Sequence, residues 1–198
     1  MKTRISNTLF ILLATLVTLS GCTNHYKYKI GVSQCVGGAW RDKANVEMLS
    51  AQHLYDNDVK VIIKNADNNN ERQCLQIDSL VDEGVDLLVV SPNDYHALNG
   101  SLQRAREKNI PIVFFDRTTA LKDYTAYIGG DNVEAGRKMA EYAVLLCRDS
   151  VKTDGRHPIV LEMTGPLAIS PAAQRHAGFS EVISKNPSID YCHVPSQW

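Results

Sequence analysis

The chain alternates between apolar segments with strand spacing and segments with helix spacing, and this alternation limits the folds it can adopt. Short continuous apolar runs are typical of buried strands, whereas apolar positions repeating every three or four residues are typical of helices. The expected strands are 28–33, 59–63, 86–90, 110–115, 126–129, 158–163 and 191–194, and the expected helices are 40–55, 71–83, 95–108, 131–147 and 170–184. Strands separated by helices predict an α/β fold with a doubly wound parallel sheet.

The expected elements fall into two groups. Residues 28–130 hold enough strands and helices for a complete N-terminal α/β lobe. Residues 131–198 hold only one helix-connected strand pair and the helix before it, which is too little to close a core. We therefore expect a complete first lobe, and a second lobe inside which the chain stops.

Apolar spacing also predicts which helix faces are buried. In the helix at 40–55, positions Ala44, Met48, Ala51 and Tyr55 share one face. In the helix at 71–83 the expected buried side carries Leu75, Ile77 and Leu80, and Gly84 ends the helix. Asp131 or Asn132 is expected to cap the helix that follows.

The first residues have the pattern of an export signal. Lys2 and Arg4 precede an apolar stretch at 9–19, which is shorter than the ~20 residues needed to span a bilayer. The stretch ends in Ser20-Gly21-Cys22, which resembles a bacterial lipoprotein box in which the Cys receives a diacylglycerol. We expect a signal peptide at 1–21, lipidation at Cys22, a polar tether at 22–27 and a membrane-anchored periplasmic domain. The alternative is an unlipidated signal peptide with a chance Cys.

Composition and motifs argue against several other functions. The net charge of −1 and the absence of a basic stripe give a nucleic-acid partner no support. Scattered His and Cys residues make a metal site unexpected. With Gly-x-Ser-x-Gly, Gly-x-Gly-x-x-Gly and the P-loop pattern all missing, we expect neither an enzyme nor a cofactor. Cys35, Cys74, Cys147 and Cys192 would permit two disulfides, but we interpret Cys74 and Cys147 as buried free thiols.

Polar residues follow the expected strands, at the sheet edge where α/β proteins bind ligands. Trp40 and Arg41 follow the first strand, Asn93 follows the third, and Asp116 and Arg117 follow the fourth. Carboxylates accept from hydroxyls, guanidinium groups donate to them, and an aromatic face packs on the apolar side of a sugar ring. Two simpler interpretations remain open here: these loops could be polar only because they face water, and Trp40 could be a core aromatic residue.

Six motifs in order resemble the periplasmic sugar-binding proteins of the ribose-binding type, which have the type I periplasmic-binding fold. They are Ile30-Gly31-Val32, Asn68-Asn69, Ser91-Pro92-Asn93-Asp94, the 110–117 segment, Ile128-Gly129-Gly130-Asp131-Asn132, and Gly165 with Ser170, Ala172, Arg175, Gly178 and Phe179. The resemblance runs from about residue 28 to 191. The 30–41 segment resembles most the sensor domains of hybrid two-component kinases from gut Bacteroidetes.

The resemblance implies roles for particular residues. Asp116 and Arg117 would grip sugar hydroxyls, and Arg175 would contact the sugar from the second lobe. Trp40 would stack on the ring, although the aromatic pair usual in such proteins is replaced here by Gly37-Gly38-Ala39. Arg41 and Asn93 complete the set of candidate ligand-binding residues.

The predicted function is therefore binding of a small sugar in the periplasm, for an ABC permease or for a histidine kinase. Two alternatives to this function remain open. One is a regulator core of the lactose-repressor type, and the other is a domain that binds a non-sugar ligand such as an autoinducer.

Overall fold

The computed structural model describes residues 26–55, 58–148 and 156–196. The predicted signal peptide, Cys22 and most of the tether lie outside these residues. None of the helices in the described part is long and apolar enough to cross a membrane.

The first lobe is built on a parallel sheet of five strands. The strands are β1 (Tyr28–Gln34), β2 (Val59–Asn65), β3 (Leu87–Ser91), β4 (Ile112–Phe115) and β5 (Ala126–Ile128), in the order β2-β1-β3-β4-β5. In the register, Val32 pairs with Ile63 on one side and with Val89 on the other. This sheet confirms the predicted parallel α/β architecture.

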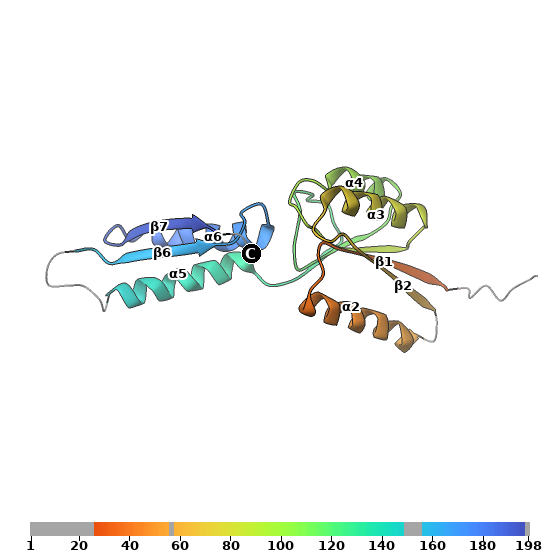
Figure 1. Cartoon of the computed structure of the whole chain (residues 1–198), viewed down its shortest axis with the longest axis horizontal. Helices are drawn as coiled ribbons and strands as arrows, with labels where there is room; N and C mark the ends of the chain where they lie inside the picture. The colour runs from red at the N-terminus through yellow and green to blue at the C-terminus, as the bar shows by residue number, and fades with distance from the viewer. Residues whose placement is uncertain (1–25, 56–57, 149–155, 197–198) are drawn as a thin grey trace, which may run out of the picture.

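Helices cover both faces of this sheet. Figure 1 shows α2 (Ala39–Ala51) on one face, and α3 (Asn70–Asp82) and α4 (Asn99–Glu107) on the other. The core lies mainly on the α3 and α4 side, where Ile77, Leu80, Leu88, Leu102 and Phe114 are fully or almost fully buried. Fewer side chains are buried on the α2 side, where Arg41 is the only buried residue of that helix.

The second unit is smaller. It contains α5 (Asn132–Arg148), β6 (Ile159–Thr164), α6 (Ser170–Ile183) and β7 (Asp190–Pro195), with β6 and β7 paired in parallel. Figure 1 shows it beside the first lobe, joined by the segment between β5 and α5. Its core contains Ala140, Val144, Phe179 and Ile183, where α5 packs on α6.

Two glycines allow α5 and α6 to approach closely. A Cβ on Gly136 would lie 1.9 Å from the Arg175 carbonyl oxygen, and a Cβ on Gly178 would lie 2.0 Å from the Val133 carbonyl oxygen. Any larger side chain would have to push backbone apart, so both positions require glycine.

Some of the predicted details are wrong. Leu75 is 64% exposed, because α3 turns Gln73, Ile77, Leu80 and Val81 towards the core instead. The first helix ends at Ala51 and continues as a 3-10 turn, η1 (Gln52–Tyr55), so Ala51 and Tyr55 are exposed.

The start of the third helix also differs from the prediction. It begins at Asn99 rather than at residue 95, because the Asp94 carboxylate accepts the backbone N–H groups of His96 and Ala97 and holds a turn there. Two other predictions hold: Gly84 follows α3 with a φ of 67°, and the Asp131 side chain accepts from Glu134 N at the start of α5.

The cysteines of the described residues are free thiols. Cys147 is buried, as predicted, but Cys74 is only half-buried and its thiol donates to the Ala97 carbonyl oxygen over 3.4 Å.

Candidate functional site

The centre of the candidate site is a charged cluster after β4. Arg41 Nη2 donates to Asp116 Oδ2 over 2.6 Å, and Arg117 Nε lies 3.8 Å from the same oxygen. The Asp116 side chain is 37% exposed and that of Arg117 is 16% exposed. Two guanidinium groups therefore flank one partly accessible carboxylate, so the pair is not an ordinary exposed ion pair.

Arg41 is the buried partner of this carboxylate. It is only 6% exposed, and its Nη1 donates to Gln34 Oε1 over 3.1 Å and to Ser91 Oγ over 2.8 Å. The side chain thus joins the ends of β1, β3 and β4, which are neighbours in the sheet. Gln34 in turn donates to Asn45 Oδ1 over 2.7 Å.

The backbone at Asp116 is held in an unusual conformation. Its φ of 65° lies in the left-handed region, which costs a residue other than glycine about 1–3 kcal/mol. The Tyr127 hydroxyl donates to the Asp116 carbonyl oxygen over 3.1 Å, and Asp116 N donates to the Ile128 carbonyl oxygen over 2.8 Å. These bonds from β5 stabilise the bend that turns the carboxylate towards Arg41. Burial, reinforced by the Asp116 carboxylate, raises the pKa of Tyr127, so its hydroxyl keeps the proton that it donates.

An aromatic pair lies next to the charged cluster. The Trp40 and Phe115 rings stack with centroids 5.5 Å apart and planes 7° from parallel, and the Arg41 guanidinium carbon is 5.2 Å from the Trp40 ring centroid. Trp40 is 58% exposed, which excludes the interpretation of this residue as a core aromatic. An exposed, oriented indole face beside hydrogen-bonding groups can pack on the apolar face of a sugar ring.

Asn93 is positioned by a buried glutamine of α3. The Gln73 side chain donates to Ser33 Oγ and to the Ser91 carbonyl oxygen, and its Oε1 accepts from Asn93 N over 2.9 Å. The Asn93 side chain donates to Asn70 Oδ1 over 2.6 Å. Gln73 therefore fixes the loop after β3 at the same sheet edge.

Arg175 lies in the second unit. Its Nη1 donates to Asn132 Oδ1 over 2.7 Å, and it lines a cavity of ~230 Å³ together with Glu162, Thr164 and Phe179. Within the described ranges, the structure records no hydrogen bond or ion pair between Arg175 and the cluster at Asp116. The structure therefore brings Trp40, Arg41, Asp116 and Arg117 together, but leaves Arg175 on a separate element.

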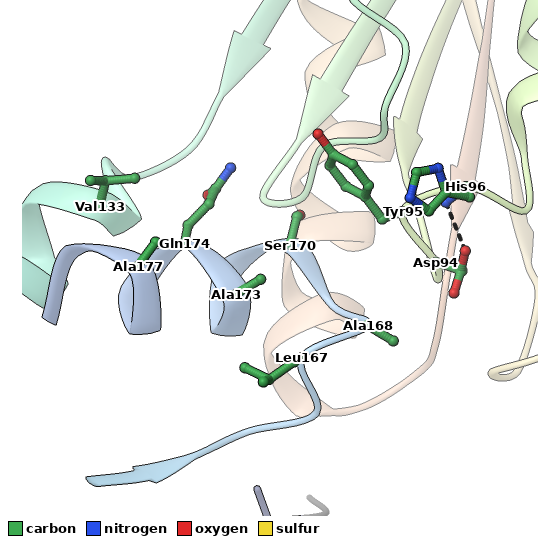
Figure 2. A pocket seen from close by; sticks show the side chains of 10 residues that line it. All are labelled: Asp94, Tyr95, His96, Val133, Leu167, Ala168, Ser170, Ala173, Gln174 and Ala177. Atoms are coloured by element: carbon green, nitrogen blue, oxygen red, sulfur yellow. Dashed lines mark hydrogen bonds between the residues drawn. The ribbon is translucent and has the colours of Figure 1, made fainter. Parts of the chain in front are cut away.

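A larger cavity lies where the two units meet. It has a volume of ~340 Å³ and is lined by Asp94, Tyr95 and His96 from the first lobe, and by residues of α5, α6 and the loop before α6 from the second. Figure 2 shows the two groups facing each other. Thr118 N donates to Ser170 Oγ over 3.0 Å beside it, so the segment after Arg117 touches the second unit there.

Metal chemistry finds no support at these positions. Among the described residues, no group of three or more His, Cys, Asp or Glu side chains could hold a metal ion. The arrangement offers donors, an acceptor and an aromatic face, which suits reversible binding of a neutral polyol.

Residues 30–198 match the model of the periplasmic binding protein domain. The chain belongs to this family. Among its curated relatives, the ribose import binding protein of Bacillus subtilis is 28% identical over 131 residues, which are 66% of this chain and 41% of that protein. The D-xylose-binding periplasmic protein of Escherichia coli is 27% identical over 71% of this chain and 42% of that protein. The chain thus spans about two fifths of the length of these relatives.

A solved structure is also similar. The fructose-binding periplasmic domain of a hybrid two-component system is 37% identical, with a TM-score of 0.74 over 87% of this chain and 54% of that one. The predicted resemblance to sugar-binding periplasmic proteins and to such sensor domains is therefore confirmed, as is the fold class.

Sequence reasoning missed several contributors to the site. Phe115 is predicted only as part of a strand, yet its ring stacks on that of Trp40. The sequence pattern could have indicated Gln73, because it is a polar residue on the same helix face as the apolar Ile77 and Leu80. No sequence pattern indicates the role of Tyr127, since its contact with Asp116 depends on how β5 pairs with β4.

Proposed function

We propose that this chain binds a small neutral carbohydrate through the carboxyl-end edge of its first sheet. The observation that carries the proposal is the cluster of Trp40, Phe115, Arg41, Asp116 and Arg117, which places a stacking face beside a charged hydrogen-bonding pair. Charged partners make the stronger hydrogen bonds to hydroxyl groups, at about 1.5–3 kcal/mol each. Binding without chemical conversion is consistent with the relatives, whose names describe binding proteins.

The ligand we favour is a monosaccharide of five or six carbons. The curated relatives bind ribose and xylose, and the structural relative with 37% identity binds fructose. D-Fructose is therefore the first sugar to test. A non-sugar ligand such as an autoinducer is the alternative ligand class, which the titration below distinguishes.

The biological role has two forms that share this site. Relatives include an import binding protein and a sensor domain, so an ABC permease and a histidine kinase are both proposed partners. A kinase reading frame next to the coding sequence would favour sensing, and permease genes would favour uptake. For either role we propose a periplasmic location, with the domain tethered to the membrane through a lipid on Cys22.

Tryptophan fluorescence tests the binding proposal directly. The chain contains two tryptophans, Trp40 and Trp198, so a Trp198→Phe variant leaves Trp40 as the only reporter. We expect D-fructose, D-ribose or D-xylose to change its emission saturably. The matched control is Asp116→Ala in the same Trp198→Phe background, in which the change in Trp40 emission should require about 10- to 100-fold more sugar. If no sugar changes the emission of Trp40, the proposal is wrong; if only an amino acid or an autoinducer does so, the ligand class is wrong.

A further inference from the structure

One end of the first lobe exposes apolar and aromatic side chains where the chain enters the domain. Leu54 and Tyr55 of η1 are 79% and 59% exposed, and Tyr28 at the start of β1 is also exposed. Figure 1 shows the amino ends of β1 and β2 together with the last turn of α2, at the end of the first lobe farthest from the second unit. We call Tyr28, Leu54 and Tyr55 the amino-end surface.

Backbone contacts hold these residues close together. Tyr28 N donates to the Asp58 carbonyl oxygen over 2.8 Å, and Asp58 N donates to the Tyr55 carbonyl oxygen over 2.7 Å. The Gln34 side chain donates to Asn45 of α2, and alternate residues of a strand share one face of the sheet, so Tyr28 also lies on the α2 face. Since η1 directly follows α2, all three side chains belong to the same side of the sheet.

Two lysines flank the amino-end surface. Lys27 Nζ lies 5.3 Å from the Tyr28 ring centroid, and Lys60 Nζ lies 5.5 Å from the Tyr26 ring centroid. Tyrosine is enriched where proteins meet lipid headgroups, because its ring is apolar and its hydroxyl is polar. Lysine can extend its ammonium group to the lipid phosphates while its carbon stem stays against apolar groups. The combination of residues is therefore suited to the headgroup layer of a membrane.

The length of the tether favours a membrane as the occupant of this surface. Cys22 and Tyr26 are four residues apart, and a fully extended chain of that length spans at most about 14 Å. A lipid on Cys22 would therefore hold the amino-end surface within reach of the headgroups. The candidate sugar site lies beyond the other end of β1, whose seven residues separate the two ends of the strand by about 20 Å.

We infer that the amino-end surface rests on the headgroup layer of a membrane, with Tyr28, Leu54 and Tyr55 at the lipid interface. This inference rests on the proposed function only through the lipid anchor at Cys22, and it adds an orientation. The carboxyl-end edge of the sheet, with the candidate sugar site, faces away from the membrane. Aspartates at 56 and 58 offset the two lysines in number, so the contact does not require anionic lipid.

Quenching of tryptophan by brominated phosphatidylcholine tests this contact. A hexahistidine tag in place of residues 1–21 tethers the chain to vesicles that contain a nickel-chelating lipid, so attachment does not depend on acylation. The reporter is Leu54→Trp in a background that carries Trp40→Phe and Trp198→Phe, and the high exposure of Leu54 leaves room for the larger ring. We expect its emission to fall by about half or more, because an interfacial side chain lies ~5–10 Å into the headgroup boundary, close to the bromines.

Native Trp40 is the control for the opposite edge of the sheet. It is the only tryptophan in Trp198→Phe, and brominated lipid should leave its emission unchanged. A second comparison uses two tyrosines of similar exposure, Tyr55 and Tyr142 of α5. In the Leu54→Trp reporter, Tyr55→Ser should reduce the quenching about twofold or more, because an aromatic ring no longer leaves water on contact. Tyr142→Ser should leave the quenching unchanged.

The outcomes separate this inference from the proposed anchor. If the introduced tryptophan keeps its emission, or if Trp40 is quenched equally, the amino-end surface does not rest on lipid and the inference is wrong. If the emission of the introduced tryptophan shifts with protein concentration before vesicles are added, a second copy covers the surface and the inference is also wrong. The anchor is tested separately, by palmitate labelling of the wild-type protein. Circular dichroism of each variant establishes that the fold is intact before quenching is measured.

Discussion

Arg41 Nη2 lies 2.6 Å from Asp116 Oδ2, and this contact joins the start of α2 to the residue after β4, next to the exposed Trp40 ring. The guanidinium is buried while the carboxylate is partly open. Asp116 can therefore still accept from a ligand, but its position is set by Arg41. The contact makes Arg41 a positioning residue for the carboxylate.

Replacing Arg41 by alanine should damage both binding and stability. The change leaves Asp116 without its closest cation and strands Gln34 and Ser91, which Arg41 also bonds. We expect sugar affinity to fall about tenfold or more and the free energy of unfolding to fall by about 1–3 kcal/mol. Calorimetric titration and urea denaturation measure the two effects. Arg72→Ala, which breaks an exposed pair with Asp67, is the control and should cost less than ~1 kcal/mol. Equal losses in the two variants would contradict the role given to Arg41.

Substitutions at Asp116 separate its charge from its backbone. Asp116→Ala should weaken sugar binding by about 10- to 100-fold and also strain the left-handed backbone. Asp116→Gly removes that strain, so it should be more stable than Asp116→Ala while binding no better. Titration with sugar and thermal unfolding distinguish the two properties. Unchanged affinity in both variants would show that the ligand does not touch this carboxylate.

The close packing of α5 on α6 predicts a large effect of one methyl group. Gly136→Ala would place Cβ against the Arg175 carbonyl oxygen, so the helices must separate and the second unit should lose stability. Gly100 provides a matched control, because it lies in α4 and a Cβ added there would have nothing within 4 Å. Gly100→Ala should leave stability unchanged or raise it by less than about 1 kcal/mol, because alanine favours a helix but residue 100 lies in the first turn of α4. Thermal unfolding of both variants measures the difference, and a stabilised Gly136→Ala would refute the predicted clash.

Alkaline pH should weaken the second unit through Tyr191. Burial, and then the hydrogen bond to Glu162, raises the pKa of Tyr191 from 10.0 to about 12. The folded state thus holds this proton more tightly than the unfolded chain. The stabilisation is complete below pH 10 and is lost as the pH rises through 12. Urea denaturation across this range should show a steeper loss in the wild type than in Tyr191→Phe. Tyr142→Phe, at an exposed position of α5, should follow the wild type; if it behaves like Tyr191→Phe, the assignment to Tyr191 fails.

The lipid anchor is testable in cells. Cys22→Ala should remove labelled palmitate from the protein and move it from the membrane fraction to the soluble periplasmic fraction, because the acylated thiol is gone. Cys35→Ala, which leaves the signal segment intact, should keep the label. Absence of label on the wild-type protein would show that the lipoprotein interpretation is wrong.

Local patterns in the chain were enough to predict the parallel α/β fold and the edge of the sheet that carries the polar loops. The reason is that strand and helix spacing are local properties, and Asp116 and Arg117 follow the strand that ends at Phe115 wherever that strand lies. Local patterns also placed Gly84 after α3 and Asp131 at the start of α5, because caps and turns depend on near neighbours.

Which side chains meet depends on the tertiary fold. Arg41 and Asp116 are 75 residues apart, and they touch because β1, β3 and β4 are adjacent in the sheet. The same strand order lets the Phe115 ring stack on Trp40 and lets the Tyr127 hydroxyl on β5 donate to the Asp116 carbonyl oxygen. The exposed Leu75 and the buried Gln73 likewise follow from the rotation of α3 about its axis on the sheet. The spacing of apolar residues in α3 is compatible with more than one such rotation. Contacts between distant segments depend on strand order and helix rotation, and no local stretch of the sequence determines either of them.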